Sequence, residues 1–268
     1  MISGIKSNGQ ITFSPLGGLS INGVEGEYCN IHTHNSDIFT GSLLLNEPSV
    51  HANSSTRTDQ RSTDNTFIRL DEEMNRRDDV KKLGISNGDF ISFNTKYQAL
   101  ENGYIKSRFL DNKAGCYILM EVARKAAEEK LSLPVELFFS SYEEVGHGGT
   151  CGYSESVDEL LVVDMGVVGD ACEGNEVSCS IFAKDSSGPY DYAMRKSLVN
   201  LARDLKIPHA VDIYPFYGSD GSAALRAGND FKVGLIGPGI AASHGMERTH
   251  KKVIEATIDL FMAYLKTK

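Results

Sequence analysis

Residues 160–166 read LLVVDMG, and this short stretch decides the fold of the second half of the chain. A run of four apolar residues bounded by polar ones is typical of a buried strand. Asp164 follows directly, at the point where this strand is predicted to end. Comparable apolar runs predict further strands at residues 135–140, 211–214 and 233–236.

Helical patterns separate these strands. Apolar residues recur every three or four positions, which places them on one face of a helix. They are Leu119, Val122, Ala123 and Ala126 in the first helix, Met194, Leu198, Leu201 and Leu205 in the second, and Ile254, Ile258, Phe261 and Leu265 in the last. Pro134 is expected to end the first helix, and Pro189 and Pro208 to bound the second. This alternation predicts an α/β fold with helices on the faces of a sheet and functional sites at the strand ends.

The first part of the chain differs in character. Its predicted strands are short and separated by Gly, Asn and Ser, at residues 10–13, 28–33, 38–45 and 90–94. Residues 51–65 are polar and predict a loop, and residues 71–83 predict a charged helix that Gly84 ends. The sequence therefore indicates a β-rich domain over residues 1–106 and an α/β domain over residues 107–268.

Composition and charge narrow the classes of function. The 268 residues include 36 Asp and Glu against 27 Lys and Arg, a formal net charge of −9. Such an acidic chain argues against nucleic acid or a membrane as a partner. A transmembrane helix and a signal peptide are not predicted, because the chain lacks an apolar run of about 18 residues and its first residues have no apolar core. Five cysteines without a C-x-x-C pair favour reduced thiols and a cytoplasmic location.

Acidic and histidine residues stand where strands end or helices begin. Asp111 precedes a predicted helix, Glu144 and Asp164 follow predicted strands, and His244 follows the strand at 233–236. Loops after the strands of one sheet can converge. Three carboxylates and an imidazole in one place would form a site for zinc, cobalt or manganese.

The adjacent residues Glu143 and Glu144 are the sharpest feature of this set. Neighbouring residues that leave a strand point in opposite directions, so one carboxylate can bind a metal while the other acts on a water molecule. Each residue also has a plainer interpretation. The pair can be an exposed acidic turn, Asp111 a helix N-cap and His244 a turn residue. The joint placement of all four positions favours the metal site.

Five strings in order resemble a known family. They are FLDNKAG at 109–115, SYEEVGHGG at 141–149, LLVVDMG at 160–166, YGSDGSAAL at 217–225 and ASHGMERTH at 242–250. Together they are similar to the tetrahedral aminopeptidases, dinuclear metallopeptidases also called glutamyl or deblocking aminopeptidases. The resemblance implies a mixed-sheet catalytic domain with helices on both faces. The strings ITFSPLGG and KKLGISNGDF resemble the family's inserted, β-barrel-like dimerisation domain.

The resemblance also implies roles for particular residues. Asp111 would bridge two divalent ions, zinc, cobalt or manganese. Glu144 and His244 would complete one metal position, and Asp164 would belong to the other. Glu143 would be the general base that activates the shared water, and Asp220 matches a family position near the substrate. The expected substrates are short peptides with a free N-terminus, and the expected assembly is a homo-oligomer, from dimer to dodecamer.

Two departures from the family pattern stand out. Lys113 occupies a position that is usually Arg, which removes a bidentate donor. The family also carries an upstream His-x-Asp motif whose His is a ligand of the second metal, and it is absent here, so the chain is expected to be an N-terminally truncated copy. His32 and His34 are interpreted as alternating strand residues rather than replacement ligands. The second metal position is therefore expected to be incomplete.

Three alternatives compete with the peptidase interpretation. A glycoside hydrolase needs two carboxyl groups about 5–9.5 Å apart across a sugar, whereas Glu143 and Glu144 are neighbours and the chain has no Trp. A truncated chain can be a catalytically impaired assembly or binding protein. Cys151 can be a nucleophile, although it lacks a marked partner and is interpreted as a small packed residue.

Overall fold

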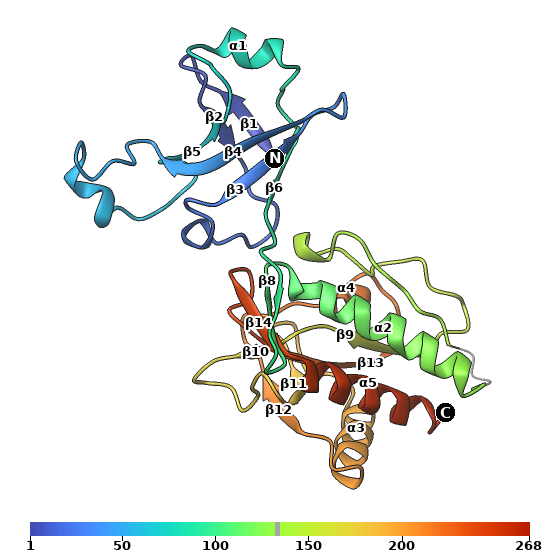
Figure 1. Ribbon diagram of the computed structural model, residues 1–268. Helices are drawn as coiled ribbons and strands as arrows, with labels where there is room; N and C mark the ends of the chain where they lie inside the picture. Colours follow the sequence, from blue (N-terminus) through green and yellow to red (C-terminus); the bar gives the residue numbers. More distant parts are fainter. Residues whose placement is uncertain (132–134) are drawn as a thin grey trace. The chain divides into compact units, whose positions relative to one another are not determined.

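A computed structural model describes residues 1–131 and 135–268, which form two compact units (Figure 1). The first comprises residues 1–95 and the second residues 96–268. Strands β7 (Gln98–Ala99) and β8 (Tyr104–Ser107) belong to the sheet of the second unit. The boundary thus lies just before these two strands, whereas the sequence-based boundary at residue 106 falls inside β8.

The first unit is an antiparallel sheet of six strands in the order β1-β2-β5-β4-β3-β6. The strands are β1 (Ile2–Ile5), β2 (Ile11–Phe13), β3 (Tyr28–His32), β4 (Ile38–Leu45), β5 (Thr66–Leu70) and β6 (Phe90–Phe93). Its two ends meet, because the N–H of Ile2 donates to the carbonyl of Asp89 at 2.9 Å and the N–H of Gly88 donates to Ile2 at 2.9 Å. The curled sheet encloses an apolar core that includes Ile11, Ile31, Leu43 and Ile68, which confirms the barrel-like prediction.

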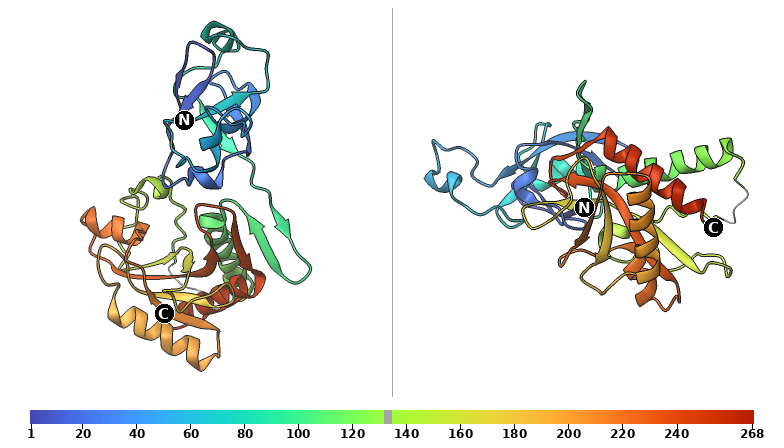
Figure 2. Two further views of the ribbon diagram at one scale, coloured as in Figure 1. Left: turned by 90° about the vertical axis from the view of Figure 1, so that its left-hand side faces the viewer. Right: turned by 90° about the horizontal axis from the view of Figure 1, so that it is seen from below.

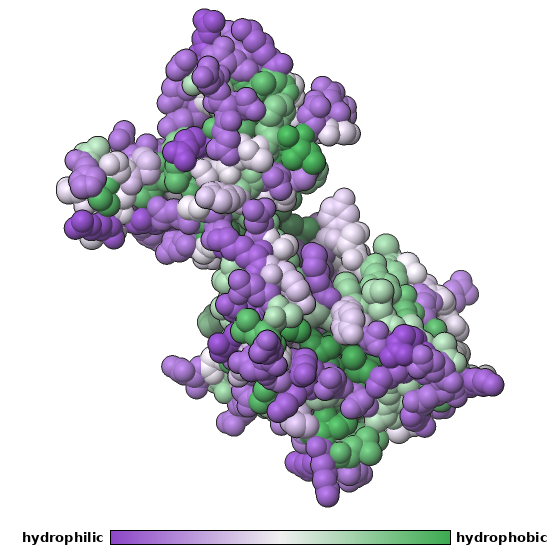
Figure 3. Space-filling view, in the orientation of Figure 1, coloured by the Kyte–Doolittle hydropathy of each residue, from purple (hydrophilic) through white to green (hydrophobic). Residues whose placement is uncertain are grey.

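The charged helix of this unit is shorter than predicted. Helix α1 spans Arg77–Lys82 instead of residues 71–83, and its surface is hydrophilic (purple at the top of Figure 3) with only Val80 buried. The carboxylate of Asp79 accepts the N–H of Asn75 at 3.2 Å, which holds the chain before the helix in a non-helical turn. Gly84, with φ of 79°, follows the helix as expected.

The second unit contains a mixed sheet of eight strands, in which the long strand β13 (Lys232–Ala241) is central. The other strands, besides β7 and β8, are β9 (Glu159–Val163), β10 (Gly166–Val168), β11 (Cys179–Lys184), β12 (His209–Ile213) and β14 (Glu247–His250). β13 pairs with β9 and β10 in parallel and with β11 and β14 in antiparallel fashion. The predicted strands at 160–163, 211–214 and 233–236 are all present, with ends that differ by at most five residues.

Helices cover both faces of this sheet, as predicted. The helices are α2 (Leu110–Glu128), α3 (Tyr192–Asp204), α4 (Asp220–Arg226) and α5 (Lys251–Leu265). Gly221 of α4 lies against Val162 of β9 and Val233 of β13. Met194 of α3 lies against Gly234 of β13, the next residue along that strand. Successive residues of a strand face opposite ways, so α3 and α4 lie on opposite faces. Figure 2 (left) likewise shows α4 (orange) and α5 (red) on opposite sides of the strands.

The largest apolar core lies on the α2, α3 and α5 side. It includes Ile118, Leu198, Ile236 and Leu260, each at most 1% exposed. The apolar spacing of the three predicted helices marks most of the faces that they bury, but Leu205, predicted on the buried stripe of α3, directly follows the helix and is 56% exposed. Of the helices described, none combines the length and the apolar character that a membrane span requires.

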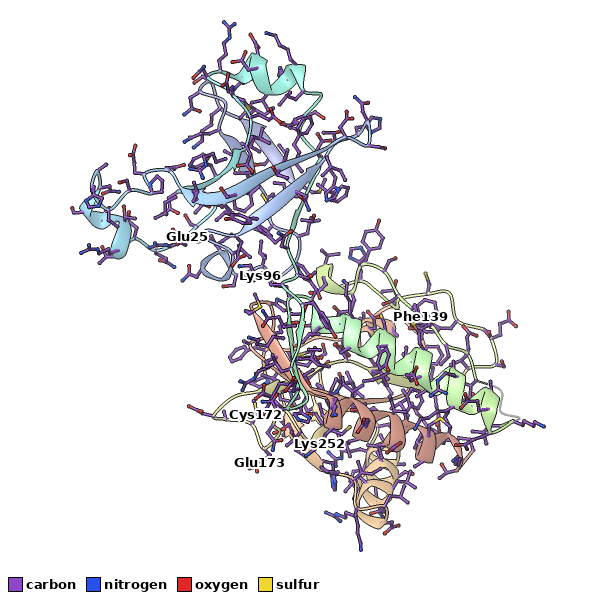
Figure 4. All side chains as sticks on the ribbon, in the orientation of Figure 1. Glu25, Lys96, Phe139, Cys172, Glu173 and Lys252 are labelled. Carbon is purple, nitrogen blue, oxygen red and sulfur yellow. The ribbon has the colours of Figure 1, made fainter. Side chains whose placement is uncertain are left out.

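The prediction of a strand at residues 135–140 is wrong. These residues have no regular secondary structure, and no described residue pairs with the edge of β9 that faces away from β13. Phe139, labelled in Figure 4, is 50% exposed and Val135 is 44% exposed. An apolar run forms a strand only when a neighbouring strand satisfies its N–H and C=O groups. Pro134, expected to end the preceding helix, lies outside the described residues.

Candidate metal centre

Asp111 lies at the start of α2, but it does not cap the helix. Its backbone is non-helical, with ψ of 105°, and a cis peptide bond joins it to Asn112. The Asn112 side chain takes the capping role instead, since its Oδ1 accepts the N–H of Gly115 at 3.0 Å. Its Nδ2 donates to the carbonyl of Val163 at 2.8 Å, which fastens this turn to the end of β9. The N-cap interpretation of Asp111 is therefore wrong, and its carboxylate is left for other contacts.

The two glutamates lie on a 3-10 turn, η3 (Glu143–Val145), and not at the end of a strand. The left-handed residues Tyr142 (φ 65°) and Gly146 (φ 85°) bound this turn. In a 3-10 turn successive side chains are about 120° apart, so the two carboxylates still diverge. Glu144 is exposed, whereas Glu143 is partly buried.

His244 lies in the tight turn that connects β13 to β14. Its φ is 62°, in the left-handed region, and the N–H of Gly245 donates to Ala242 across the turn at 3.0 Å. The N–H of His244 donates to the carboxylate of Glu247 at 3.1 Å. A residue without a glycine's freedom adopts this conformation only where its surroundings hold it, and such positions concentrate at functional sites.

Three side chains from these three segments form a group that could hold a metal ion. His244 Nε2 lies 3.4 Å from Asp111 Oδ2 and 3.6 Å from Glu144 Oε2. One ligand atom from each residue lies within 4.8 Å of the others. Tetrahedral zinc with bonds of about 2.0–2.1 Å separates its ligand atoms by about 3.3 Å. The spacing and the donor set, two carboxylates and an imidazole, therefore suit zinc and similar cations.

Asp164 is not part of this three-residue group. It directly follows β9, is 5% exposed, and accepts the N–H of Met165 at 2.7 Å. Burial raises its pKa well above the usual range, and the charges of Asp111 and Glu143 add to this effect, so its carboxyl lies near theirs. Gly237 permits this arrangement, because a Cβ there would lie 1.5 Å from the carbonyl oxygen of Asp164.

Glu143 has the environment of a proton acceptor at neutral pH. Its pKa is raised from the usual 4.5 to about 7, mainly by burial and in smaller amounts by the charges of Glu144, Asp220 and Asp111. The pKa of Glu144 is also raised, first by burial and then by Asp111, while His244 and Lys113 act in the opposite direction. Crowded carboxylates thus hold protons when no cation balances them.

The raised pKa of Glu143 predicts how the stability of the metal-free chain depends on pH. The pKa of Glu143 is higher in the folded chain than in the unfolded one, so the folded state binds more protons between pH 4.5 and about 7. Raising the pH through this window should lower the melting temperature by a few degrees in the presence of a chelator. Glu143→Gln should make the melting temperature depend less on pH in this window. Saturating zinc should make it rise with pH instead. A chelated chain whose melting temperature is constant from pH 4.5 to 7.5 would contradict the raised pKa of Glu143.

Asp220 lies beside the glutamate turn. It opens α4, and the hydroxyl of Ser140 donates to its Oδ2. Its Oδ1 is buried and has no hydrogen-bond partner within the part of the chain that the structure describes. Gly148 allows the close approach, since a Cβ there would lie 2.5 Å from Asp220 Oδ1 and 2.8 Å from the Cα of Glu143.

Sequence reasoning overlooked Glu247, whose carboxylate contacts the backbone of both Asp111 and His244. Its position three residues after His244 was the one sequence feature that pointed to a place in the site. Cys151 is exposed, so its interpretation as a packed residue is wrong. His32 is a strand residue, as predicted, and its Nε2 pairs with Ser92 Oγ at 2.7 Å, but His34 lies in the turn that follows β3.

An α/β unit that gathers carboxylates and an imidazole beside its strand ends has the architecture of a metallopeptidase. Residues 1–260 match the model of the M42 glutamyl aminopeptidase family. The chain therefore belongs to this family of metal-dependent aminopeptidases, as the sequence motifs indicated.

Individual proteins agree with this assignment. The Bacillus subtilis protein named "Putative aminopeptidase YhfE" is 42% identical over 269 residues, which cover all of this chain and 78% of that protein. Two solved structures share the fold. A TET aminopeptidase from the Thaumarchaeota archaeon SCGC AB-539-E09 has a TM-score of 0.87 at 18% identity, covering 99% of this chain and 76% of its own. The Pyrococcus horikoshii TET1 peptidase has a TM-score of 0.82 at 20% identity, and the match covers 98% of this chain and 79% of that protein.

Proposed function

We propose that this chain hydrolyses the first peptide bond of short peptides with a free N-terminus, with Glu143 as the general base. One observation carries the proposal. Asp111, Glu144 and His244 place ligand atoms within 4.8 Å of one another, and the adjacent Glu143, which is not in that group, lies in a partly buried, acidic environment. The same turn thus offers a ligand and a separate proton acceptor.

Asp111, Glu144 and His244 would hold one cation, and Asp111 and Asp164 would contribute to a second. Divalent ions bound there would lower the pKa of water and polarise the scissile carbonyl. No histidine is assigned to the second position, whereas the first has His244, so we infer that the first position binds more tightly. Zinc, cobalt and manganese all suit these donors.

Glu143 would move the proton. A base with a pKa near neutrality can take a proton from the attacking water and deliver it to the amine that leaves. Its partial burial limits competing solvent, and the Gly-rich segment after the turn lets Asp220 approach it closely.

We further propose a homo-oligomer in the cytoplasm, in which the first unit mediates dimer formation. The Pyrococcus horikoshii TET1 peptidase, which shares the fold, can assemble into a tetrahedron or a large octahedral shell. The five cysteines of this chain are free thiols, which supports a reducing compartment.

Hydrolysis of a panel of dipeptides with different N-terminal residues would test the function. We expect release of the first residue, loss of activity on chelation and recovery with zinc or cobalt. N-acetylated versions of the same peptides are the matched control and should remain intact. A zinc-loaded chain that cleaves none of the free peptides would contradict the proposal and favour an assembly or binding protein.

A further inference from the structure

Glu247 is a buried carboxylate that connects two of the three segments of the candidate metal centre. It is the first residue of β14 and is 1% exposed. Its Oε1 accepts the N–H of His244 at 3.1 Å, and its Oε2 accepts the N–H of Asp111 at 3.1 Å. The carboxylate also accepts a backbone hydrogen bond from Leu110, the neighbour of Asp111, so its donors come from two segments far apart in the chain.

The N–H groups of His244 and Asp111 both need such a partner. His244 has a left-handed backbone in the turn after β13, and Asp111 has a non-helical backbone at the start of α2. Neither N–H lies within a regular helix or strand, where a neighbouring carbonyl would accept it. One rigid carboxylate that accepts both fixes the separation of the two backbones, and with it the 3.4 Å separation of the Asp111 and His244 side chains.

We propose that Glu247 is a positioning residue that holds Asp111 and His244 at the spacing a divalent cation requires. This inference rests on the proposed function, which makes those two residues ligands. Glu247 itself would not touch the ion. Groups that orient metal ligands in this way typically change metal affinity by about 10–100-fold when they are replaced.

The chemistry of the carboxylate makes the inference testable. Glutamine has nearly the same shape, but its amide offers one acceptor oxygen and an NH₂ donor. In Glu247→Gln one backbone N–H would therefore face another donor. Aspartate keeps both oxygens and the charge but is one methylene shorter, so Glu247→Asp should reach only one of the two segments.

Asp212 provides a matched control. It is also buried, at 6% exposed, and its two oxygens accept the N–H groups of Glu173 (labelled in Figure 4) at 2.8 Å and Gly174 at 2.9 Å. These residues precede β11 and are not part of the metal group. Asp212→Asn makes the same chemical change at a carboxylate that holds two backbone donors elsewhere in the same unit.

The measurement is zinc affinity, by competition with a chromophoric chelator, together with the melting temperature of the metal-free chain. We expect Glu247→Gln to bind zinc about 10–100-fold more weakly, with Glu247→Asp between it and the wild type. Asp212→Asn should lower the metal-free melting temperature but leave zinc affinity within about twofold of wild type, because its carboxylate contacts no proposed ligand.

Two results would overturn the inference. One is wild-type zinc affinity in folded Glu247→Gln or, if that variant does not fold, in Glu247→Asp. The other is an equal loss of affinity in Asp212→Asn. A wild-type chain that does not bind zinc would instead refute the metal centre itself.

Discussion

Replacing Glu143 with glutamine is expected to lower kcat by at least about 100-fold while leaving the zinc content unchanged. General base catalysis is typically worth about 10²–10⁴-fold, and an amide cannot take the proton. Glu143 lies outside the group formed by Asp111, Glu144 and His244, so its replacement removes no ligand of that group. The raised pKa of this carboxyl, about 7 and due mainly to burial, suits a base that works near neutral pH.

Glu144→Gln is the matched comparison, because it makes the same change at the neighbouring position of η3. Glu144 Oε2 lies 3.6 Å from His244 Nε2, so this variant should lose zinc as well as activity. Glu121 lies on α2 and pairs with Arg124, so Glu121→Gln should change neither the zinc content nor kcat. If Glu143→Gln keeps more than about a hundredth of the wild-type kcat at full zinc loading, the general-base role is wrong.

The parts of the fold that the sequence predicted are those whose signal is local. Strand β13 and helices α3 and α5 bury apolar runs or stripes, and β9 is a continuous apolar run, so a short window of residues reveals them. Residues 135–140 have the same kind of run and form no strand, because pairing depends on a neighbour that no local window contains. The same limit applies to α1, where Asp79 holds Asn75 outside the helix.

The candidate site was predictable to a similar extent. The positions of Asp111, Glu144 and His244 after strands or before helices suggested that they converge, and the structure brings these three together. Asn112 caps the helix in place of Asp111. Its side chain also contacts Val163, which is 51 residues away in the sequence, so a local pattern could not reveal this role. Glu247 was overlooked for the same physical reason, since its partner Asp111 is 136 residues away.

The purified chain is expected to hold about one zinc or cobalt ion tightly, and His244→Ala is expected to release it. Three protein ligands are the number typical of catalytic zinc, and Asp111, Glu144 and His244 supply them. Replacing His244 would leave two carboxylates, which compete poorly with water for these cations. For the second position we propose only the carboxylates of Asp111 and Asp164, without a histidine.

Elemental analysis after extensive dialysis would measure both expectations. His147→Ala is the matched control, because His147 is an exposed histidine three residues after Glu144 that stacks on Tyr142 and is not in the group. It should retain the ion. Since the ion binds the folded state, the melting temperature should also fall on chelation in the wild type and not in His244→Ala. Two tightly held ions per wild-type chain would mean that a residue outside this group completes the second position.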